Sequence, residues 1–518
     1  MRSSRVPQAL TCGLAVLLVA ACTGDPEPPE PGPEEEPSPV PTVFDGEAPP
    51  GIEGEVLRYL HGDTADVHEI LADPLGVRIS PVGDALLISS GSEDRHLLHD
   101  AATGETLWEG EARFGGFDTD RDGERVLLMA EADGTPFVLD ARGERLWEPA
   151  EKGDAYLDGL AVRRPGGWSS QEPHGAFSLL DPGGDELWSY EFEAPPGPEA
   201  EEGSEDAEGT EDTEPAGDAS EESGEGAGEE PDLGVPVAAR DGLVLLASGG
   251  PTLHAYSVDP DAGADSDTDT DGAAAGDELW KVDGGEADLG LPTSAPVPAP
   301  QVIGFYPLPG PEGGSAPEED PGEGGEDTGG GGEAAAGEDG EVLLLRWAQS
   351  ETPSMLSAHD PETGDLLWTL EEPGANPVVG PFEPAGVAGS LYDDTTGTLL
   401  LPQAGGEAPV VAIDLAAGEV LWGLEEDAGA ISPAFAFDGL VYGDSRASTG
   451  GDRQLVLDAV TMDVVEDEMP AYVEAVTESG HAVLVQGRQR FVYGPPPEDG
   501  EESGEPSDGA TGSPGAAD

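Results

Sequence analysis

Short apolar runs, each followed by a polar turn and a second short run, repeat along most of the chain. Examples are Pro136-Phe-Val-Leu139 before Asp140 and Val410-Val-Ala-Ile413 before Asp414. Runs of about four to six residues bounded by Asp and Gly are typical of β-strands, and stretches with a helical period are scarce. The pattern therefore predicts an all-β protein assembled from strand–turn–strand units.

The turn inside these units carries a recurring spacing of Asp, Gly and Trp. An Asp side chain accepts hydrogen bonds from backbone N–H groups two residues on, and Gly takes the positive φ that other residues resist. The Trp then falls at a fixed place on the outgoing strand. The residues of this motif are Asp100, Gly104, Trp108, Asp140, Gly143, Trp147, Asp181, Gly184, Trp188, Trp280, Asp360, Gly364, Trp368, Asp414, Gly418 and Trp422.

Self-similarity with a period of about 40 residues and four short strands per unit is typical of a β-propeller. The Asp-x-x-x-Gly-x-x-x-Trp unit resembles the PQQ-like propeller repeat, found in quinoprotein dehydrogenases and in the lipoprotein BamB. The resemblance implies a propeller over residues 54–494. Counting the units predicts eight blades, although weak marking of the third and last units also allows seven.

The two ends of this region are expected to meet. The stretch Gly54–Leu60 matches the outer strand of a blade, with an aliphatic residue or Tyr in place of the Trp. The strands that this blade lacks appear at Ala482–Val485 and Arg490–Tyr493. We expect the N-terminal strand to complete the last blade, because closure leaves no sheet edge open.

The first residues are typical of a bacterial lipoprotein. Arg2 and Arg5 precede an apolar stretch, Ala9–Ala21, that is too short to span a bilayer. Its end resembles a lipobox, which predicts a signal peptide over 1–21, lipidation of Cys22 and an extracytoplasmic place on the cell membrane. The alternatives are an ordinary secretory signal or an uncleaved anchor. Residues 22–53, rich in Pro and Glu, are expected to form a disordered tether.

Charge narrows the set of partners. The formal net charge is -90, which disfavours nucleic acid and anionic lipid headgroups because both would be repelled. Much of the acid lies in inserts at 195–232, 260–276 and 310–340 and in a tail at 495–518. Low hydrophobicity and charge of one sign predict that these segments are disordered. We expect a monomer.

Two acidic stretches have a spacing that resembles a metal site. Asp267, Asp269, Asp271 and Glu278 have the spacing of a calcium-binding loop, but such spacing also arises by chance in an acidic chain. The Asp118-to-Gly123 stretch is a weaker match and reads equally as a hairpin turn. The resemblance would also imply a quinone site with an adjacent-cysteine pair and an amide ligand. The chain has no adjacent cysteines, and Asn376 is its only Asn. We expect no resident cofactor, with Ca²⁺ as the open alternative.

These residues favour a non-enzymatic scaffold that binds an envelope protein or peptide. The alternatives are a PQQ-dependent dehydrogenase, whose quinone the Trp residues would stack on, and a sensor or solute-binding lipoprotein. In a scaffold the Trp residues pack between blades, and His99 and His359 are structural. Near the C-terminal end lies a group of cations that either docks an acidic partner or neutralises the protein's own inserts: Arg446, Arg453, Arg488 and Arg490.

Overall fold

The structure is a computed structural model, and its described residues lie between Phe44 and Pro496. Those residues are 44, 46–60, 68–73, 75–193, 233–259, 273–285, 289–291, 296–310, 340–348, 353–374, 376–404, 409–424, 431–445, 453–467, 469, 471–486 and 489–496. The expected signal peptide, Cys22, most of the expected tether and of the acidic inserts, and nearly all of the acidic tail lie outside them.

The described strands form eight antiparallel sheets of four strands each, which confirms the predicted eight-bladed propeller. Within a blade, the first strand is innermost and the fourth outermost. Blades one to four contain β2 (Val77–Val82), β3 (Ala85–Ser90), β4 (His96–Asp100), β5 (Thr106–Gly110); β6 (Arg113–Thr119), β7 (Arg125–Ala130), β8 (Pro136–Leu139), β9 (Arg145–Trp147); β10 (Asp154–Leu157), β11 (Leu160–Arg163), β12 (Gly175–Leu180), β13 (Glu186–Phe192); and β14 (Val235–Arg240), β15 (Leu243–Ala247), β16 (Thr252–Ser257), β17 (Glu278–Asp283).

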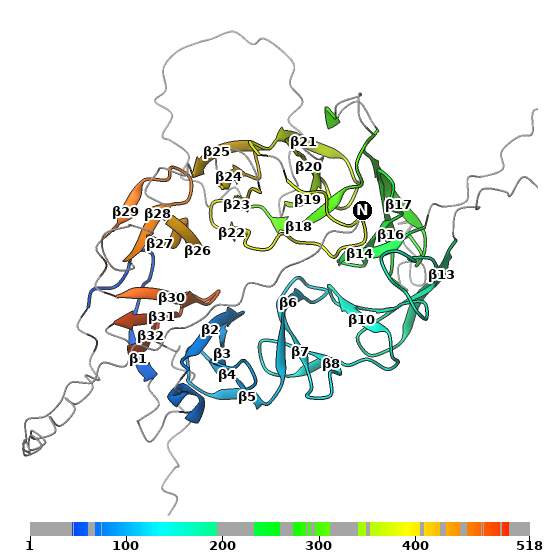
Figure 1. Ribbon diagram of the computed structural model, residues 1–518. Coiled ribbons are helices and arrows are strands. Elements are labelled where there is room, and N and C mark those ends of the chain that lie inside the picture. Colours follow the sequence, from blue (N-terminus) through cyan, green and yellow to red (C-terminus); the bar gives the residue numbers. More distant parts are fainter. Residues whose placement is uncertain are drawn as a thin grey trace, which may run out of the picture. The chain divides into compact units, whose positions relative to one another are not determined.

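The remaining blades continue in chain order, as the labels and colours of Figure 1 show. Blades five to eight contain β18 (Gln301–Pro307), β19 (Glu341–Trp347), β20 (Met355–His359), β21 (Leu366–Glu371); β22 (Leu391–Asp393), β23 (Thr398–Pro402), β24 (Val410–Asp414), β25 (Glu419–Leu424); β26 (Ile431–Phe437), β27 (Leu440–Ser445), β28 (Arg453–Asp458), β29 (Val464–Glu466); and β30 (Tyr472–Val476), β31 (Ala482–Gln486), β32 (Gln489–Gly494), β1 (Glu55–Leu60). One 3-10 helix, η1 (Glu69–Ala72), precedes β2.

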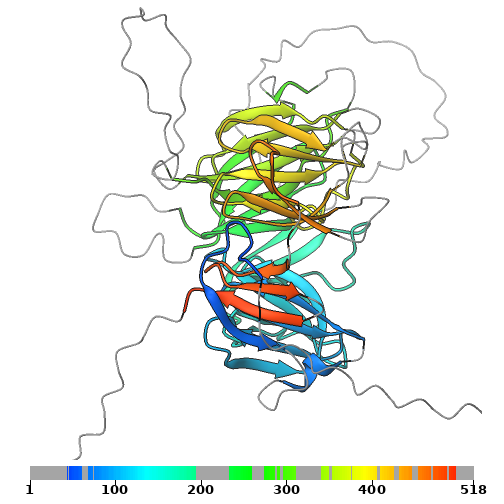
Figure 2. The same ribbon diagram turned by 90° about the vertical axis from the view of Figure 1, so that its left-hand side faces the viewer.

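The ring is closed because a strand from the N-terminal end of the propeller joins the sheet formed by the last three strands. β1 pairs antiparallel with β32, from Glu55 opposite Gly494 to Leu60 opposite Arg490. Figure 2 shows β1, in blue, beside the red strands of this sheet. The prediction that the N-terminal strand completes the last blade is therefore confirmed, and blade eight has the same four strands as the others.

The core is divided among the contacts between neighbouring blades. Blades four and five, for example, share a cluster that includes Val237, Leu245 and Trp347, all nearly or fully buried. The contact between blades eight and one is of the same kind, with Val483 and Val492 packed against Leu86. Similar clusters join each of the other neighbouring pairs. Burial of these faces holds the sheets side by side.

Connections alternate between the two faces of the ring. Turns between first and second strands, and between third and fourth, lie on one face, which we call the hairpin face. In the sequence, the 260–276 and 310–340 inserts fall between β16 and β17 and between β18 and β19. The described residues at their ends are part of the blades: Gly276 donates to the Ser257 carbonyl and Leu308 donates to the Gly340 carbonyl.

Among the described residues, the structure contains no helix with the length and apolar character needed to cross a membrane.

Candidate functional site

The repeated Asp builds the turn that joins the third and fourth strands of a blade. The Asp360 carboxylate accepts hydrogen bonds from the backbone N–H groups of Glu362 and Thr363, at 2.8 and 3.2 Å. Gly364 closes the turn by donating to the Asp360 carbonyl and has a φ of 74°. Asp414 and Asp100 form equivalent turns, and Asp140 and Asp181 form shorter ones. These carboxylates are occupied by backbone donors.

The repeated Trp joins one blade to the next. Trp280, Trp368 and Trp422 each donate from Nε1 to a backbone carbonyl at 2.8 to 3.0 Å. The acceptor is always the residue directly after the turn Asp of the following blade. Their rings are therefore spread around the propeller at one contact per blade pair, rather than gathered around a single pocket.

The turn Gly is needed for this contact as well as for its φ. A Cβ on Gly418 would lie 2.4 Å from Cδ2 of Trp368, and a Cβ on Gly364 would lie 2.7 Å from Cδ2 of Trp280. A Cβ on Gly143 would lie 2.7 Å from Cβ of Trp108 and 2.9 Å from the Leu107 carbonyl oxygen. The Gly–Trp pairs are thus a second reason, besides turn geometry, for the periodic glycine.

The other predicted motif residues vary this arrangement. Trp108 and Trp147 pack in the clusters between blades one and two and between blades two and three. Trp188 packs between blades three and four, where its Nε1 meets Gly276. Gly184 has φ 95° with no neighbour close to its Cβ position, so only the turn requires it.

The joint between blades eight and one contains an arginine that the sequence analysis missed. We expected an aliphatic residue or Tyr at the Trp position of the N-terminal strand; the structure corrects this, because the residue there is Arg58. Its Nη2 donates to the carbonyls of Asp100, at 2.8 Å, and Ala101, and its Nη1 donates to Ala102 at 3.0 Å. The Ala101 carbonyl is the position that Trp donates to elsewhere. The spacing from Gly54 to Arg58 equals the Gly-to-Trp spacing and could have indicated it.

His99 and His359 both lie inside blades with neutral rings. Nε2 of His99 accepts from Nε of Arg58 at 3.1 Å. Burial, reinforced by the Arg58 charge, lowers the pKa of His99 to about 4. His359 contacts Ser357 and the Gly364 carbonyl, and burial lowers its pKa. Both rings are buried and their contacts are made inside the blades, which agrees with structural roles.

Asn376 belongs to a buried network between blades five and six. Its Nδ2 donates to Glu372 at 2.9 Å, and its Oδ1 accepts from the backbone of Ala404. The side chain of Glu372 has no exposed surface. Its carboxylate also accepts a bidentate pair of hydrogen bonds from Nη2 and Nε of Arg346, at 2.7 and 3.0 Å. Gln403 completes the set with a 3.0 Å bond to Glu372. A guanidinium, not a metal ion, balances the carboxylate, and the amide oxygen is already used.

Two carboxyl groups meet at the inner hairpins of blades two and three. Asp158 accepts from the Ala239 N–H at 3.0 Å and from the Thr119 hydroxyl at 3.3 Å. Burial, followed by its hydrogen bond and repulsion with Asp118, raises the pKa of Asp158 well above its usual range. Asp158 therefore keeps its proton to a higher pH than a free aspartic acid does. Nearby, Asp120 accepts from the N–H groups of Asp122 and Glu124, so the Asp118-to-Gly123 stretch is a hairpin turn.

The other predicted site residues are only partly described. Asp267, Asp269, Asp271, Arg446 and Arg488 lie outside the described residues. Glu278 begins β17, with its carboxylate 3.6 Å from Nδ1 of His254. Arg453 begins β28. Arg490 makes two hydrogen bonds to Glu474, at 2.5 and 3.0 Å, within blade eight. Within the described ranges, no three His, Cys, Asp or Glu side chains are grouped so that they could hold a metal ion.

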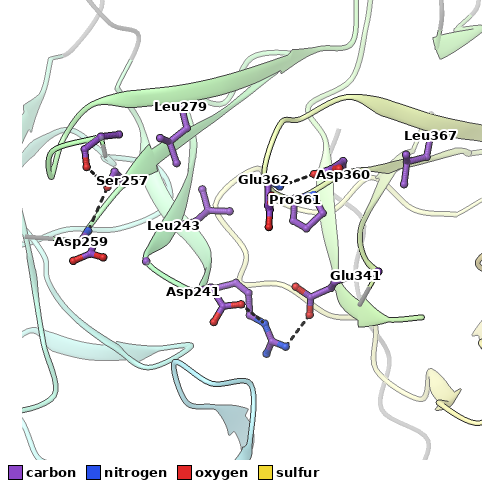
Figure 3. A pocket seen from close by; sticks show the side chains of 14 residues that line it. Asp241, Leu243, Ser257, Asp259, Leu279, Glu341, Asp360, Pro361, Glu362 and Leu367 are labelled. Atoms are coloured by element: carbon purple, nitrogen blue, oxygen red, sulfur yellow. Dashed lines mark hydrogen bonds and ion pairs between the residues drawn. The ribbon is translucent and has the colours of Figure 1, made fainter. Parts of the chain in front are cut away.

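A cavity of about 490 Å³ lies between blades four and five on the hairpin face. Its apolar lining includes Leu243, Leu279, Pro361 and Leu367, and its polar lining includes Arg240, Asp241, Ser257, Asp259, Glu341, Asp360 and Glu362. Figure 3 shows the leucines Leu243 and Leu279 opposite the turn that carries Asp360, Pro361 and Glu362. That turn is held by the Trp280 contact to Pro361, so a rigid joint forms one wall.

An ion pair lies at one end of this cavity (Figure 3). Nη2 of Arg240 is 2.7 Å from Oε1 of Glu341, and its Nε is 3.6 Å from Asp241. Burial raises the pKa of Glu341, and the Arg240 charge opposes that rise. Because a single guanidinium faces several carboxylates, the lining is predominantly acidic. No sequence pattern pointed to this cavity, since its lining residues come from separate turns.

Comparisons with known proteins give fold-level likenesses only. No family model matches the chain, and no curated protein matches its sequence. Solved structures similar to it include BamB from Moraxella catarrhalis, at 12% identity over 80% of this chain and 96% of that one, with a TM-score of 0.34. A quinohemoprotein alcohol dehydrogenase from Comamonas testosteroni matches at 12% identity over 82% and 76%, with a TM-score of 0.37. Apo AztD from Citrobacter koseri matches at 12% identity over 76% and 85%, with a TM-score of 0.38.

These include both kinds of propeller protein that the repeated motif resembles. Likenesses of this strength do not separate a scaffold from an enzyme, so function must be argued from the residues of this chain.

Proposed function

We propose that this chain is a non-enzymatic propeller lipoprotein, anchored outside the cytoplasm, that serves as a binding scaffold at the cell envelope. The main support for the proposal is that the motif Trp residues and the Asn376 amide, which could contact a cofactor, make their hydrogen bonds inside the joints between blades. Trp280, Trp368 and Trp422 each donate a hydrogen bond from Nε1 to a backbone carbonyl of the next blade. The only Asn of the sequence, Asn376, is buried in a network with Arg346 and Glu372. A rigid ring then offers its faces and rim to partners.

Crosslinking in intact cells tests the scaffold. A photoreactive amino acid at Val378, in the connection between blades five and six, or at Val464, in the outer strand of blade seven, lies on exposed surface. We expect at least one such position to give a discrete adduct identifiable by mass spectrometry. The matched control places the same amino acid at Leu86 in the core, where no adduct should form. Absence of any discrete adduct at the exposed positions would contradict a docking role.

The competing enzyme class makes a separate prediction. A quinoprotein dehydrogenase would change the absorbance of added PQQ in the presence of Ca²⁺, whereas the scaffold should not. We expect no difference spectrum, because the Asn376 amide oxygen already accepts a hydrogen bond from Ala404 and Arg346 neutralises Glu372. A saturable spectral change with substrate-dependent bleaching would overturn the proposal.

The anchor has its own test. Lipidation at Cys22 requires the thiol, so Cys22→Ser should move the protein from the membrane fraction to the soluble extracytoplasmic fraction. A durable anchor is expected from the acyl chains, since each buried methylene contributes about 0.8 kcal/mol. Unchanged membrane association of the variant would instead indicate an uncleaved N-terminal segment.

The expected partner remains an envelope protein or peptide, with Arg446, Arg453 and Arg488 proposed among its contacts.

A further inference from the structure

We propose that the cavity between blades four and five binds a small organic cation with an apolar body, such as an aryl-alkyl ammonium compound. This role is independent of whether the ring also docks a protein. It would make the chain a ligand-binding lipoprotein at a site defined by the hairpin face.

Size is the first argument. The cavity measures about 490 Å³, which lies inside the range of about 300 to 1,000 Å³ found for small-molecule sites. One wall is fixed by the hydrogen bond from Trp280 Nε1 to the Pro361 carbonyl, at 3.0 Å. The Asp241–Gly242 hairpin turn forms another part of the lining, with positive φ at both residues. The site is therefore largely formed before a ligand arrives.

The apolar lining is the second argument. Leu279 is 42% exposed in spite of its size, and it lines the cavity together with Leu243 and Leu367. These side chains come from both blades, so they would contact an apolar group from two sides. Covering Leu279 and Leu367 would remove apolar surface from water, which favours a ligand with a hydrophobic body.

Charge is the third argument, and it sets the sign of the ligand. Asp241, Asp259 and Glu362 are exposed carboxylates in the lining, and Arg240 is the only cation among the lining residues. Arg240 already pairs with Glu341 at 2.7 Å, so its charge is largely balanced there. A cationic head would be attracted, and an anion or an acidic segment of this chain would be repelled.

Calorimetric titration with 4-phenylbutylamine tests the proposal, using the full chain at about 0.15 M salt to screen general attraction by the acidic surface. The matched neutral probe is 4-phenylbutanol, which has a similar apolar body and no charge. We expect saturable binding of the amine with one site per chain and at least tenfold weaker binding of the alcohol. Heat that does not saturate, or equal affinity for the two probes, would overturn the proposal.

Variants then locate the site. Asp241→Asn with Glu362→Gln should weaken amine binding about tenfold, because two carboxylates are neutralised while Asn still suits the hairpin turn. The matched control, Asp463→Asn with Glu105→Gln, removes the same charge from exposed positions in blades seven and one and should bind as the parent does. Leu279→Arg, at an exposed position, should abolish binding by placing a cation in the cavity. Equal weakening by the control pair, or unchanged binding in Leu279→Arg, would contradict this site.

Discussion

Nε of Arg58 donates a hydrogen bond to Nε2 of His99 across the closure between blades eight and one, at 3.1 Å. The same guanidinium donates to consecutive carbonyls of the turn that begins at Asp100. This joint closes the ring with an arginine at the position where blades four, five and six use an indole. The chemistry is equivalent, because both side chains present N–H donors to the carbonyl after the turn Asp.

Replacing Arg58 tests the importance of the closure. Arg58→Ala leaves the carbonyls of Asp100, Ala101 and Ala102 without their donor, which should lower the free energy of unfolding by about 2–4 kcal/mol. Arg58→Trp should lose less, since an indole Nε1 can reach the same carbonyl. The melting temperatures of the two variants and the parent give the comparison. A larger loss in Arg58→Trp than in Arg58→Ala would show that the two side chains are not equivalent at this position.

His99 makes the closure sensitive to acid. Its pKa is about 4 in the folded protein and about 6.5 when unfolded, so the unfolded chain takes up the proton first as pH falls. The stability contributed by neutral His99 is present above pH 6.5 and is lost as pH falls toward 4, by about 3 kcal/mol at most. His99→Gln keeps an acceptor for Arg58 and removes the titration. Melting curves at pH 7 and 5 should therefore show a smaller acid loss in the variant; an equal loss would contradict a neutral His99.

Asp158 has the opposite pH dependence. Its folded pKa is raised, so the folded protein holds a proton that the unfolded chain releases above about pH 3.9. The associated stability is present below that pH and is lost as pH rises through the raised pKa. Asp158→Asn mimics the protonated carboxyl beside Asp118 and tolerates the positive φ of 45°.

The measurement for this pair is the difference in melting temperature between Asp158→Asn and the parent at pH 4.5 and pH 8. The melting temperature of the variant, relative to that of the parent, should rise with pH. Asp463→Asn, an exposed substitution in blade seven, serves as the control and should show no such trend. A difference that stays constant with pH would mean that the pKa of Asp158 is not raised in the folded protein.

The buried network of blades five and six should depend on both of its charges. Arg346→Met leaves Glu372 charged and fully buried, with an expected loss of about 3–5 kcal/mol. Adding Glu372→Leu should recover a large part of that loss, because two apolar side chains of similar volume need no counter-charge. Denaturant unfolding of the single and double variants measures the recovery. A double variant no more stable than Arg346→Met would contradict the charge-balance explanation.

The fold could be predicted from the sequence because its joints are local in the chain. Asp, Gly and Trp at Asp360, Gly364 and Trp368 specify a turn, a close approach and a packed indole within nine residues, and the pattern repeats. It survives degradation: Met462 takes φ 62° at the Gly position of blade seven, and Trp422 still donates to the carbonyl of Ala459.

The site could not be predicted in the same way because its contacts are distant in the chain. The buried network forms only when blades five and six pack and bring together Arg346, Glu372 and Gln403. The spacing of these residues in the sequence does not predict this contact. The cavity likewise draws Arg240 and Glu362 from different blades. Arg58 was not predicted because an aliphatic residue or Tyr was expected at the Trp position, whereas the joint requires a hydrogen-bond donor.

The central claim is that the repeated Trp residues are joints of a closed ring, and the melting temperature of Trp368→Ala tests it most directly. The indole packs on Gly418 and donates to the Leu415 carbonyl at 2.8 Å, so its loss should cost about 3–5 kcal/mol. Trp168→Ala, which removes an indole outside the motif whose Nε1 has no hydrogen-bond partner among the described residues, should cost less. The predicted result is a melting temperature that Trp368→Ala lowers clearly more than Trp168→Ala does, and an unchanged melting temperature for Trp368→Ala would contradict the account.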